Sequence, residues 1–417
     1  MKTITRLVEN YVVKSLASFP IVYIAGPRQS GKTTLAKHIS STRHKATYIT
    51  FDDIQIRSAA SRDPEAFLRN LEGPVILDEV QMVPEVFRPL KVIVDENRNK
   101  KNKGRGQFLL TGSANIMILP KLSDALVGRM VLHNLLPFSA CEIDGKQKQN
   151  FITRAFTGKW HFRQINIDTK NNLTMLSYAS FPELLTLKSY ALKHEWCNSY
   201  LNTILQRDIR TLSEIDKVTS LPNMLRFLAS RAGGVLNEAA LSRTVELNHL
   251  TIKKYRILLE SLFLILSIPA WSSNLGKRLV KSPKIYLSDL NLLSYLLNIN
   301  FKDLPNQNSS LWGQVLENFV AIELNKQLAF SDLKTRIFHY RANSGQEVDF
   351  LLEGPDGKIV AIEVKAASKV LAKDFRHIEA LQIDISDKFH LGFVVYQGKD
   401  IVPFGNNLFA IPMGCLW

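Results

Sequence analysis

The sequence predicts an α/β protein of three successive units, and three observations on its 417 residues lead to that expectation. Short apolar runs alternate with helical patterns over residues 1–140, which is typical of a parallel sheet covered by helices. Residues 141–300 are mainly helical in their spacing. A long amphipathic pattern and a second set of strand-like runs follow in residues 301–417, which predicts a second α/β unit. A chain of this length is too long for one core, so we expect three domains.

Composition limits the function before any motif is considered. The hydrophobic share of 46% and the charged share of 22% are ordinary for a folded soluble protein. The formal net charge of +15, with a pI near 9.6, is high and favours a polyanionic partner. Such a partner would be nucleic acid or an anionic membrane surface. Nucleic acid is the one that we expect from this charge, and a mildly basic enzyme without such a partner is the alternative.

Cysteine usage and hydropathy indicate a cytoplasmic protein that does not enter a membrane. Cys141, Cys197 and Cys415 are scattered and odd in number, so neither a disulfide framework nor a zinc site is expected. Charged residues and a proline interrupt the apolar N-terminus, unlike a secretory signal. The longest apolar stretch, residues 258–271, is shorter than the roughly 18 residues that a membrane span needs.

Residues 21–39, IVYIAGPRQSGKTTLAKHI, combine a short apolar strand, the pattern G-x-x-x-x-G-K-T and a helical pattern. Gly26 and Gly31 allow the backbone to curl so that its N–H groups point at phosphate oxygens, and the helix adds its positive N-terminal end. Lys32 would reach the β and γ phosphates, and Thr33 would place its hydroxyl on Mg²⁺. ATP and Mg²⁺ are therefore the expected cofactors. The predicted ATP contacts are Gly26, Pro27, Arg28, Gln29, Ser30, Gly31, Lys32, Thr33 and Thr34.

Residues 73–81, GPVILDEVQ, predict a buried strand that ends in two acids. Asp78 would hold the Mg²⁺ through water, and Glu79 would orient or deprotonate the water that attacks the γ-phosphate. An acidic pair that only caps a strand is the alternative. Because Glu79 directly follows Asp78, the pair favours a hydrolase over a kinase, which must keep water out.

Two further segments carry candidate sensors of the nucleotide. Residues 106–115 predict a strand that ends in hydroxyls, and Thr111 and Ser113 would sense the γ-phosphate unless they only form a strand-to-helix turn. Arg129 is a candidate arginine finger, acting in cis or on the nucleotide of a second copy, and a surface arginine is the alternative. A role in trans would require a homodimer or a ring.

Taken in order, the segments GPRQSGKTT, FDD, ILDEVQ, LLTGSAN, LVGRM and PFSACEI resemble a large bacterial and archaeal family of AAA+-like ATPases. The resemblance covers most of the chain. It implies a P-loop NTPase parallel sheet in which another strand separates the P-loop strand from its neighbour in sequence. It also implies a C-terminal region of uncharacterised function, so it indicates no substrate. Arg207 or Arg210, around the QRDI segment, would lie near the nucleotide or else be an exposed charge on a lid helix.

Residues 221–265 predict three helices, of which Asn237 caps the second and the third begins near Thr251. An apolar run on each side of residues 267–283 suggests a strand pair, so the module reads as a winged helix. The third helix of such a module enters the major groove, although winged helices also serve as protein-contact modules. Both partners stay open. The predicted DNA contacts are Thr251, Lys253, Lys254, Arg256, Lys277 and Arg278.

Residues 347–365, EVDFLLEGPDGKIVAIEVK, predict a hairpin that carries acids and a lysine. Glu363 and Lys365 project to one face of a strand, and Asp349 would face them from the preceding strand. Carboxylates at that range bind a divalent ion, and a lysine beside them stabilises a negatively charged transition state. Glu317, on an amphipathic helix upstream, would supply a third acid.

These four positions resemble the PD-(D/E)XK nuclease fold, which has Glu on a helix, Asp on one strand and Glu-x-Lys on the next. The resemblance implies catalytic roles for Asp349, Glu363 and Lys365, and metal-binding roles for Glu317, Asp349 and Glu363. Glu347 would be a neighbour rather than a ligand. The alternatives are an edge strand that carries charges by accident and a nuclease fold that binds without cleaving.

The sequence thus predicts a Mg²⁺-dependent ATP-hydrolysing protein that acts on nucleic acid, with a DNA nuclease under nucleotide control as the specific hypothesis. Lys32 and Glu79 would carry the ATPase reaction. The first alternative is an ATP-dependent switch that binds DNA or a protein partner while its nuclease-like domain is silent. The second is a protein-remodelling ATPase, which would lack the steep salt dependence of phosphate contacts.

Overall fold

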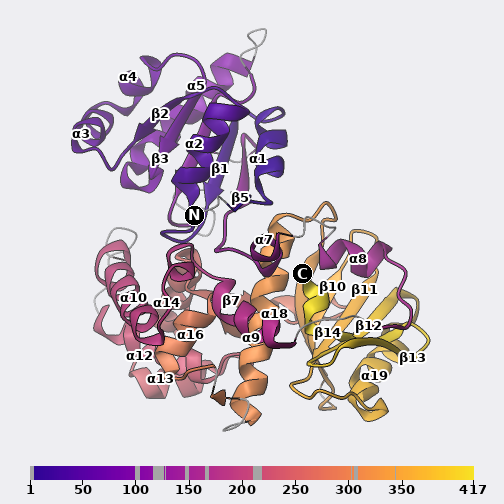
Figure 1. Cartoon of the computed structure of the whole chain (residues 1–417). Coiled ribbons are helices and arrows are strands. Elements are labelled where there is room, and N and C mark those ends of the chain that lie inside the picture. Colours follow the sequence, from indigo (N-terminus) through magenta and orange to yellow (C-terminus); the bar gives the residue numbers. More distant parts are fainter. Residues whose placement is uncertain are drawn as a thin grey trace.

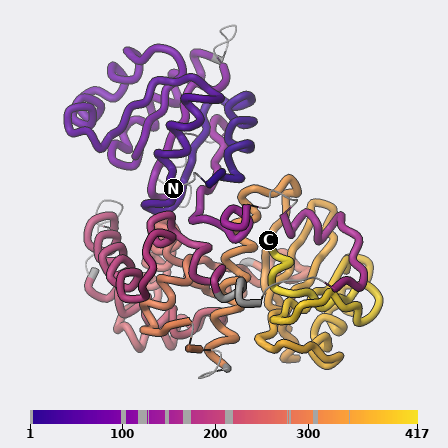
Figure 2. Tube along the Cα trace, in the orientation of Figure 1, coloured from indigo at the N-terminus to yellow at the C-terminus, as the bar shows by residue number. Residues whose placement is uncertain are grey.

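The computed structural model describes residues 4–98, 104–115, 126, 128–145, 150–164, 169–209, 218–301, 303–304, 309–342 and 344–417. The protein is α/β, as predicted. Figure 1 shows a parallel-sheet part at the top, a helical part below it and a second sheet beside the helical part. The tube in Figure 2 follows the chain from indigo to yellow; residues 150–164 lie at the second sheet before the chain continues into the helical part. Among the helices that the structure describes, none is long and apolar enough to cross a membrane.

The first sheet has five strands in the order β2-β3-β4-β1-β5, and all its pairs are parallel. The P-loop strand β1 is not adjacent to β2, the next strand in sequence, which agrees with the family resemblance. Two strands, β3 and β4, lie between them. The side chains of β1 are all buried, because helices cover both faces of the sheet. The strands are β1 Ile21–Ala25, β2 Thr47–Thr50, β3 Val75–Asp78, β4 Phe108–Gly112 and β5 Met130–Asn134. The helices are α1 Glu9–Leu16, α2 Lys32–Thr42, α3 Ile54–Arg62, α4 Pro64–Arg69 and α5 Phe87–Arg98.

The helical part contains the three helices predicted for residues 221–265, followed by a two-stranded antiparallel hairpin. Asn237 caps the second helix by accepting from the N–H of Ala240, and Asn248 caps the third by accepting from Thr251. In the hairpin, Ile265 pairs with Leu287 and Ile268 with Lys284. The elements are α7 Ala140–Asp144, α9 Thr169–Tyr178, α10 Tyr190–Thr203, a π-helix Ile204–Asp208, α12 Leu221–Ser230, α13 Glu238–Val245, α14 His249–Ser261, β7 Ile265–Ile268, α15 Leu275–Val280, β8 Lys284–Leu287 and α16 Leu290–Leu297.

The second sheet has seven strands in the order β6-β13-β14-β12-β11-β10-β9. Alternate side chains of β10 and β11 pack on opposite faces, against α18 on one side and α19 on the other. The strands are β6 Arg163–Gln164, β9 Arg336–Arg341, β10 Glu347–Glu353, β11 Ile359–Val364, β12 Phe389–Tyr396, β13 Asp400–Gly405 and β14 Leu408–Pro412. The helices are α8 Phe151–Thr157, α18 Ser309–Ala329 and α19 Arg376–Ile385. Segment 150–164, expected in the helical unit, joins this sheet instead, because β6 pairs with β13 and α8 packs on β12.

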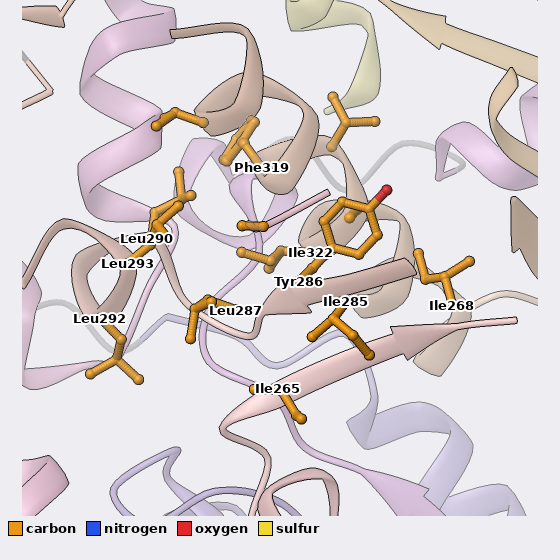
Figure 3. Packing of buried hydrophobic residues seen from close by; sticks show 14 of the residues in the cluster. Ile265, Ile268, Ile285, Tyr286, Leu287, Leu290, Leu292, Leu293, Phe319 and Ile322 are labelled. Atoms are coloured by element: carbon orange, nitrogen blue, oxygen red, sulfur yellow. The ribbon is translucent and has the colours of Figure 1, made fainter. Parts of the chain in front are cut away.

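The long helix α18 contacts the hairpin and the start of α7, which follows the first sheet. Its Asn318 hydrogen-bonds both the N–H and the carbonyl of Leu287 in the hairpin. Its Glu323 accepts from the N–H of Ala140, which follows the first sheet. Figure 3 shows Tyr286 of β8 in the buried cluster that also contains Phe319 and Ile322 of α18. This helix therefore fixes the hairpin against the second sheet.

Candidate functional sites

The P-loop follows β1 and ends where α2 begins. Gly31 has a φ of 94°, which is left-handed and suits glycine. A Cβ at Gly26 would lie 2.1 Å from the carbonyl oxygen of Leu135, so no larger side chain fits there. These two glycines curl the chain as predicted. The hydroxyl of Ser30 is buried within the loop and has no hydrogen-bond partner among the described residues.

Lys32 lies inside this curl, with 4% of its surface exposed. Its Nζ donates to the carbonyl oxygens of Gly26 at 3.0 Å and Pro27 at 2.9 Å. Burial lowers the pKa of Lys32, and the nearby carboxylates of Glu79 and Asp78 act in the opposite direction. The loop thus holds a cation against backbone curled for phosphate, which fits the triphosphate of a nucleotide. Thr34, the last predicted ATP contact, is exposed on the first turn of α2.

Asp78 lies buried at the carboxyl end of β3 and accepts three hydroxyl hydrogen bonds. Thr33 donates to its Oδ2 at 2.9 Å, Tyr48 donates to the same oxygen at 2.6 Å, and Thr111 donates to its Oδ1. Parallel strands bring these residues to one edge of the sheet. A hydroxyl and a carboxylate in contact are the hard oxygen donors that Mg²⁺ takes in nucleotide sites, so Thr33 and Asp78 fit this ion.

Glu79 adopts a left-handed backbone conformation, with a φ of 58°, which is uncommon for a residue other than glycine. Its N–H donates to Thr111 Oγ1 at 3.3 Å. Its Oε2 accepts from the amide of Gln81, which also donates to Ser113 Oγ at 2.8 Å. The two predicted sensors, Thr111 and Ser113, therefore lie beside the acidic pair. Sequence reasoning assigned no role to Gln81 or Tyr48, although Gln81 lies two residues after Glu79 in the same motif.

Arg28 links the P-loop to the helical part. Its Nε lies 2.5 Å from Oδ2 of Asp208 in the π-helix, and the hydroxyl of Tyr200 donates to its carbonyl at 3.4 Å. The partner of the loop in the QRDI segment is thus Asp208, while Arg207 is exposed and Arg210 lies outside the described residues. Sequence reasoning missed this contact because 180 residues separate the two side chains.

Arg129 does not lie near the P-loop of its own chain. It immediately precedes β5, and its carbonyl accepts from the N–H of Ile21 at the first residue of β1, whereas the P-loop follows the last residue of that strand. Its guanidinium forms two hydrogen bonds of 2.7 Å with the carboxylate of Asp95. The prediction that Arg129 acts as an arginine finger in cis is therefore wrong for this structure. Its action on the nucleotide of a second copy stays a prediction.

A second polar cluster lies between α18, β10 and β11, where the chain brings together the four residues that resemble a nuclease centre. Glu317 comes from α18, Asp349 from β10 and Glu363 from β11. Asp349 Oδ2 accepts from the N–H of Val364 at 2.9 Å, and Lys365 Nζ donates to Glu363 Oε1 at 2.9 Å. This is the arrangement that the hairpin pattern predicts.

Sequence reasoning missed the central residue of this cluster, Lys284 of β8. Its Nζ lies 2.8 Å from Glu347 Oε1, 3.0 Å from Glu317 Oε1 and 3.2 Å from Asp349 Oδ1. The side chain is 2% exposed. Burial by itself lowers the pKa of Lys284, but the three carboxylates outweigh it and hold the pKa above its usual value. Glu347, expected as a bystander, is therefore a direct partner of this ammonium.

Two carboxyls of this cluster, Glu317 and Glu363, hold their protons more tightly than exposed acids do. Burial, followed by the charge of Asp349, raises the pKa of Glu317 to about 7 and that of Glu363 to about 8. Tyr286 also donates to Glu317, at 2.7 Å. The Oε2 of Glu363 is buried and has no partner in the described part of the chain.

The predicted metal site of this cluster is not formed. Within the ranges that the structure describes, no group of three or more His, Cys, Asp or Glu side chains is placed to hold a metal ion. The physical reason is the ammonium of Lys284, which lies between Glu317 and Asp349. As arranged, Glu317, Asp349 and Glu363 do not fit a divalent cation.

The predicted DNA contacts differ in how exposed their side chains are and in whether they are paired within the protein. Lys253 and Lys254 are exposed on α14, and Thr251 is half-buried near its start. Arg256 pairs with Glu260 at 2.6 Å. The side chain of Lys277 lies outside the described residues.

Arg278 was expected to contact DNA from the connection between the two strands, and its position contradicts this. Its guanidinium makes two hydrogen bonds, of 2.9 and 3.0 Å, to the carboxylate of Glu353 in β10. It also lies over the rings of Trp271 and Phe338. The connection between β7 and β8 packs against the second sheet, so this arginine is engaged within the protein.

Family models match three successive segments of the chain. Residues 18–144 match a family model described as an AAA domain. Together with the strand order and the P-loop, this match supports an AAA-like P-loop domain in this segment and supports ATP binding. Residues 171–303 and 312–416 match two domains of unknown function, DUF8612 and DUF4143.

Individual relatives give no activity. An uncharacterized protein of Mycobacterium tuberculosis, Rv2008c, and another of Mycobacterium bovis, Mb2031c, are each 25% identical over 399 residues, which cover 96% of this chain and 81% of theirs. Among solved structures, a Walker-type ATPase of Pyrococcus abyssi has a TM-score of 0.42 at 14% identity, covering 70% of this chain and 96% of its own. AMPPCP-bound DnaA from Aquifex aeolicus has a TM-score of 0.27 at 15% identity, covering 61% and 87%.

Proposed function

We propose that this protein hydrolyses ATP and uses the nucleotide state of its P-loop domain to control contacts with nucleic acid. In this proposal its C-terminal nuclease-like domain does not cleave nucleic acid. The observation that carries the ATPase is the network that joins Thr33, Asp78 and Thr111 at the carboxyl edge of the sheet, with Glu79 directly beside it.

Each residue of the network has a role in the proposed hydrolysis. Lys32 binds the β and γ phosphates, and Thr33 with Asp78 would hold Mg²⁺, which neutralises phosphate charge. Glu79 orients and deprotonates the attacking water. Gln81 keeps the Glu79 carboxylate aimed by holding its Oε2.

The nucleic-acid part of the proposal rests on charge and on the order of elements in the helical part. Helices α12 to α14 followed by the β7–β8 hairpin have the element order of a winged helix, in which the third helix reads DNA. Lys253 and Lys254 are exposed on that third helix, in a chain with a net charge of +15. A protein partner on the same face is the second candidate.

A silent nuclease-like domain is favoured over an active one by Lys284. A metal-dependent nuclease needs a divalent ion between its carboxylates, and here an ammonium lies within 3.2 Å of three of them. The nuclease hypothesis is therefore replaced by its alternative, a nucleotide-dependent switch.

The test combines binding and cleavage on the full-length protein. Affinity for linear and branched DNA is measured at two salt concentrations with ADP or a non-hydrolysable ATP analogue, for wild type and Lys32→Ala. We expect the DNA affinity of the wild type, but not that of Lys32→Ala, to change with the bound nucleotide. We expect the DNA affinity to fall steeply as the salt concentration rises. Absence of salt-dependent binding would favour the protein partner.

The same substrates are incubated with Mg²⁺ or Mn²⁺, with and without ATP, using wild type and Lys365→Ala. The proposal expects no cleavage of any substrate. Cleavage by the wild type that Lys365→Ala abolishes would overturn the silent domain and restore the nuclease.

A further inference from the structure

We infer that Lys284 is a built-in cation that replaces a divalent metal in the acidic cluster of the C-terminal domain and so joins the β7–β8 hairpin to it. This inference deepens the proposed function, because it gives the physical reason why the nuclease-like domain is silent. It concerns a residue outside the four positions that resemble a nuclease centre.

The donors of the ammonium match the surrounding acceptors in number, and the two are opposite in the sign of their charge. A lysine ammonium has three N–H donors, and Nζ of Lys284 has three carboxylate oxygens within 3.2 Å. Glu317 comes from α18, and Glu347 and Asp349 come from β10. All three N–H groups are thus satisfied by acids, which is the condition under which a charged lysine is stable when buried.

The backbone holds Lys284 in place from two sides. It pairs with Ile268 across the hairpin, and its other edge bridges to Val235. Tyr286, two residues further along β8 and hence on the same face, donates to the same Oε1 of Glu317 that Lys284 contacts. Lys284 therefore cannot leave the cluster without moving the hairpin.

An ammonium and a divalent ion exclude each other at this position. A divalent ion bound to Glu317 and Asp349 would lie within a few ångströms of Nζ, where repulsion between like charges in a buried site is strong. The cluster retains one further acceptor, since Oε2 of Glu363 is buried without a partner in the described chain. Removing the ammonium alone would leave Glu317, Asp349 and Glu363 as a set of carboxylates that needs a cation.

The test is Mn²⁺ binding to full-length protein, measured by electron paramagnetic resonance in a Lys32→Ala background that weakens the P-loop site. The site in question is the one that Asp349→Asn removes. We expect no such Mn²⁺ site while Lys284 is present. We expect one Mn²⁺ site in Lys284→Met, with an affinity at least tenfold higher than that of any Asp349-dependent site in protein that retains Lys284. Lys281→Met, on the same connection but exposed, is the matched control and should gain nothing.

Stability provides a second readout. We expect Lys284→Met to lower the Tm, and millimolar Mn²⁺ to restore it in this variant but not in wild type. If Lys284→Met does not fold even with Mn²⁺, the inference is tested by Mn²⁺ binding to protein that retains Lys284. Absence of Asp349-dependent Mn²⁺ binding there supports the inference. Asp349-dependent Mn²⁺ binding with Lys284 present would overturn it, as would a folded Lys284→Met that binds no Mn²⁺.

Failure of this inference can be told from failure of the proposed function. ATP hydrolysis and nucleotide-dependent DNA binding are measured with Lys32 intact and do not involve the acidic cluster. A wild type that hydrolyses no ATP would refute the proposed ATPase while leaving the Mn²⁺ result on Lys284 unaffected.

Discussion

The guanidinium of Arg28 in the P-loop lies 2.5 Å from the carboxylate of Asp208 in the helical part. Asp208 is buried, with 8% of its side chain exposed, and Arg28 retains 27%. The loop that would bind phosphate is therefore tied directly to the π-helix that continues α10, which belongs to the same helical part as α14, the helix of the proposed nucleic-acid surface. A change in the P-loop on nucleotide binding can therefore reach the helical part through this pair and through the hydrogen bond from Tyr200 to the carbonyl of Arg28.

Asp208→Asn should loosen this connection. A hydrogen bond to a charged partner contributes about 1.5–3 kcal/mol, and because Arg28 is partly exposed we expect a loss of about 1–2 kcal/mol in the free energy of unfolding. Chemical denaturation measures it. Glu195→Gln, on the exposed face of α10, is the control and should change stability little. Equal stability of Asp208→Asn and wild type would show that the contact is not energetically coupled.

Gln81→Ala should lower the rate of ATP hydrolysis without changing ATP affinity. Gln81 holds the carboxylate of Glu79 from one side and Ser113 from the other. Without it Glu79 is less well aimed, and we expect kcat to fall about tenfold, since positioning of a catalytic base acts on the chemical step. The control is Gln55→Ala on exposed α3. A rise in KM with kcat unchanged would contradict the positioning role.

The acidic cluster should make stability depend on pH. The pKa of Glu317 is raised to about 7 and that of Glu363 to about 8, so the folded protein holds protons that the unfolded chain releases near pH 4.5. The free energy of unfolding should therefore fall as pH rises from about 5 through 8, and then level off. Glu363 faces Asp349, Lys365 and Lys284.

Glu363→Gln removes one of the two titrations, and its Tm between pH 5 and 8.5 is compared with that of wild type. We expect the variant to lose less stability across this window, so that it gains on wild type as pH rises. Glu379→Gln, exposed on α19, is the control. A difference between variant and wild type that does not vary with pH would contradict the raised pKa.

Replacing both Lys253 and Lys254 by Ala should weaken DNA binding and reduce its dependence on salt. Each lost phosphate contact lowers the slope of log K against log salt by about 0.9. Lys45→Ala combined with Lys399→Ala, at two exposed lysines outside the helical part, controls for the loss of two charges. Arg256→Ala should have less effect on the slope, because that guanidinium is paired with Glu260. An unchanged slope in the double variant would move the DNA surface elsewhere or favour a protein partner.

The parts of the fold that the sequence predicts are those with local signals. A few neighbouring residues are enough to predict the P-loop, the acidic pair at Asp78 and the helix cap at Asn237. The structure contains all three features. Lys284 and Asp208 were not foreseen as partners of distant groups, because a buried lysine on a strand has the same sequence pattern as an exposed one. Which side chain reaches Glu317 or Arg28 depends on how the parts pack, and no periodicity reports that.

Single-turnover hydrolysis of ATP by Glu79→Gln tests the central claim most directly. The variant retains the P-loop, Asp78 and the sensors, so we expect ATP to bind with wild-type affinity while the rate of hydrolysis falls by about 10² or more, the usual contribution of a general base. Hydrolysis by Glu79→Gln at the wild-type rate would contradict the account, since the site built from Lys32, Asp78 and Glu79 would then not be where ATP is cleaved.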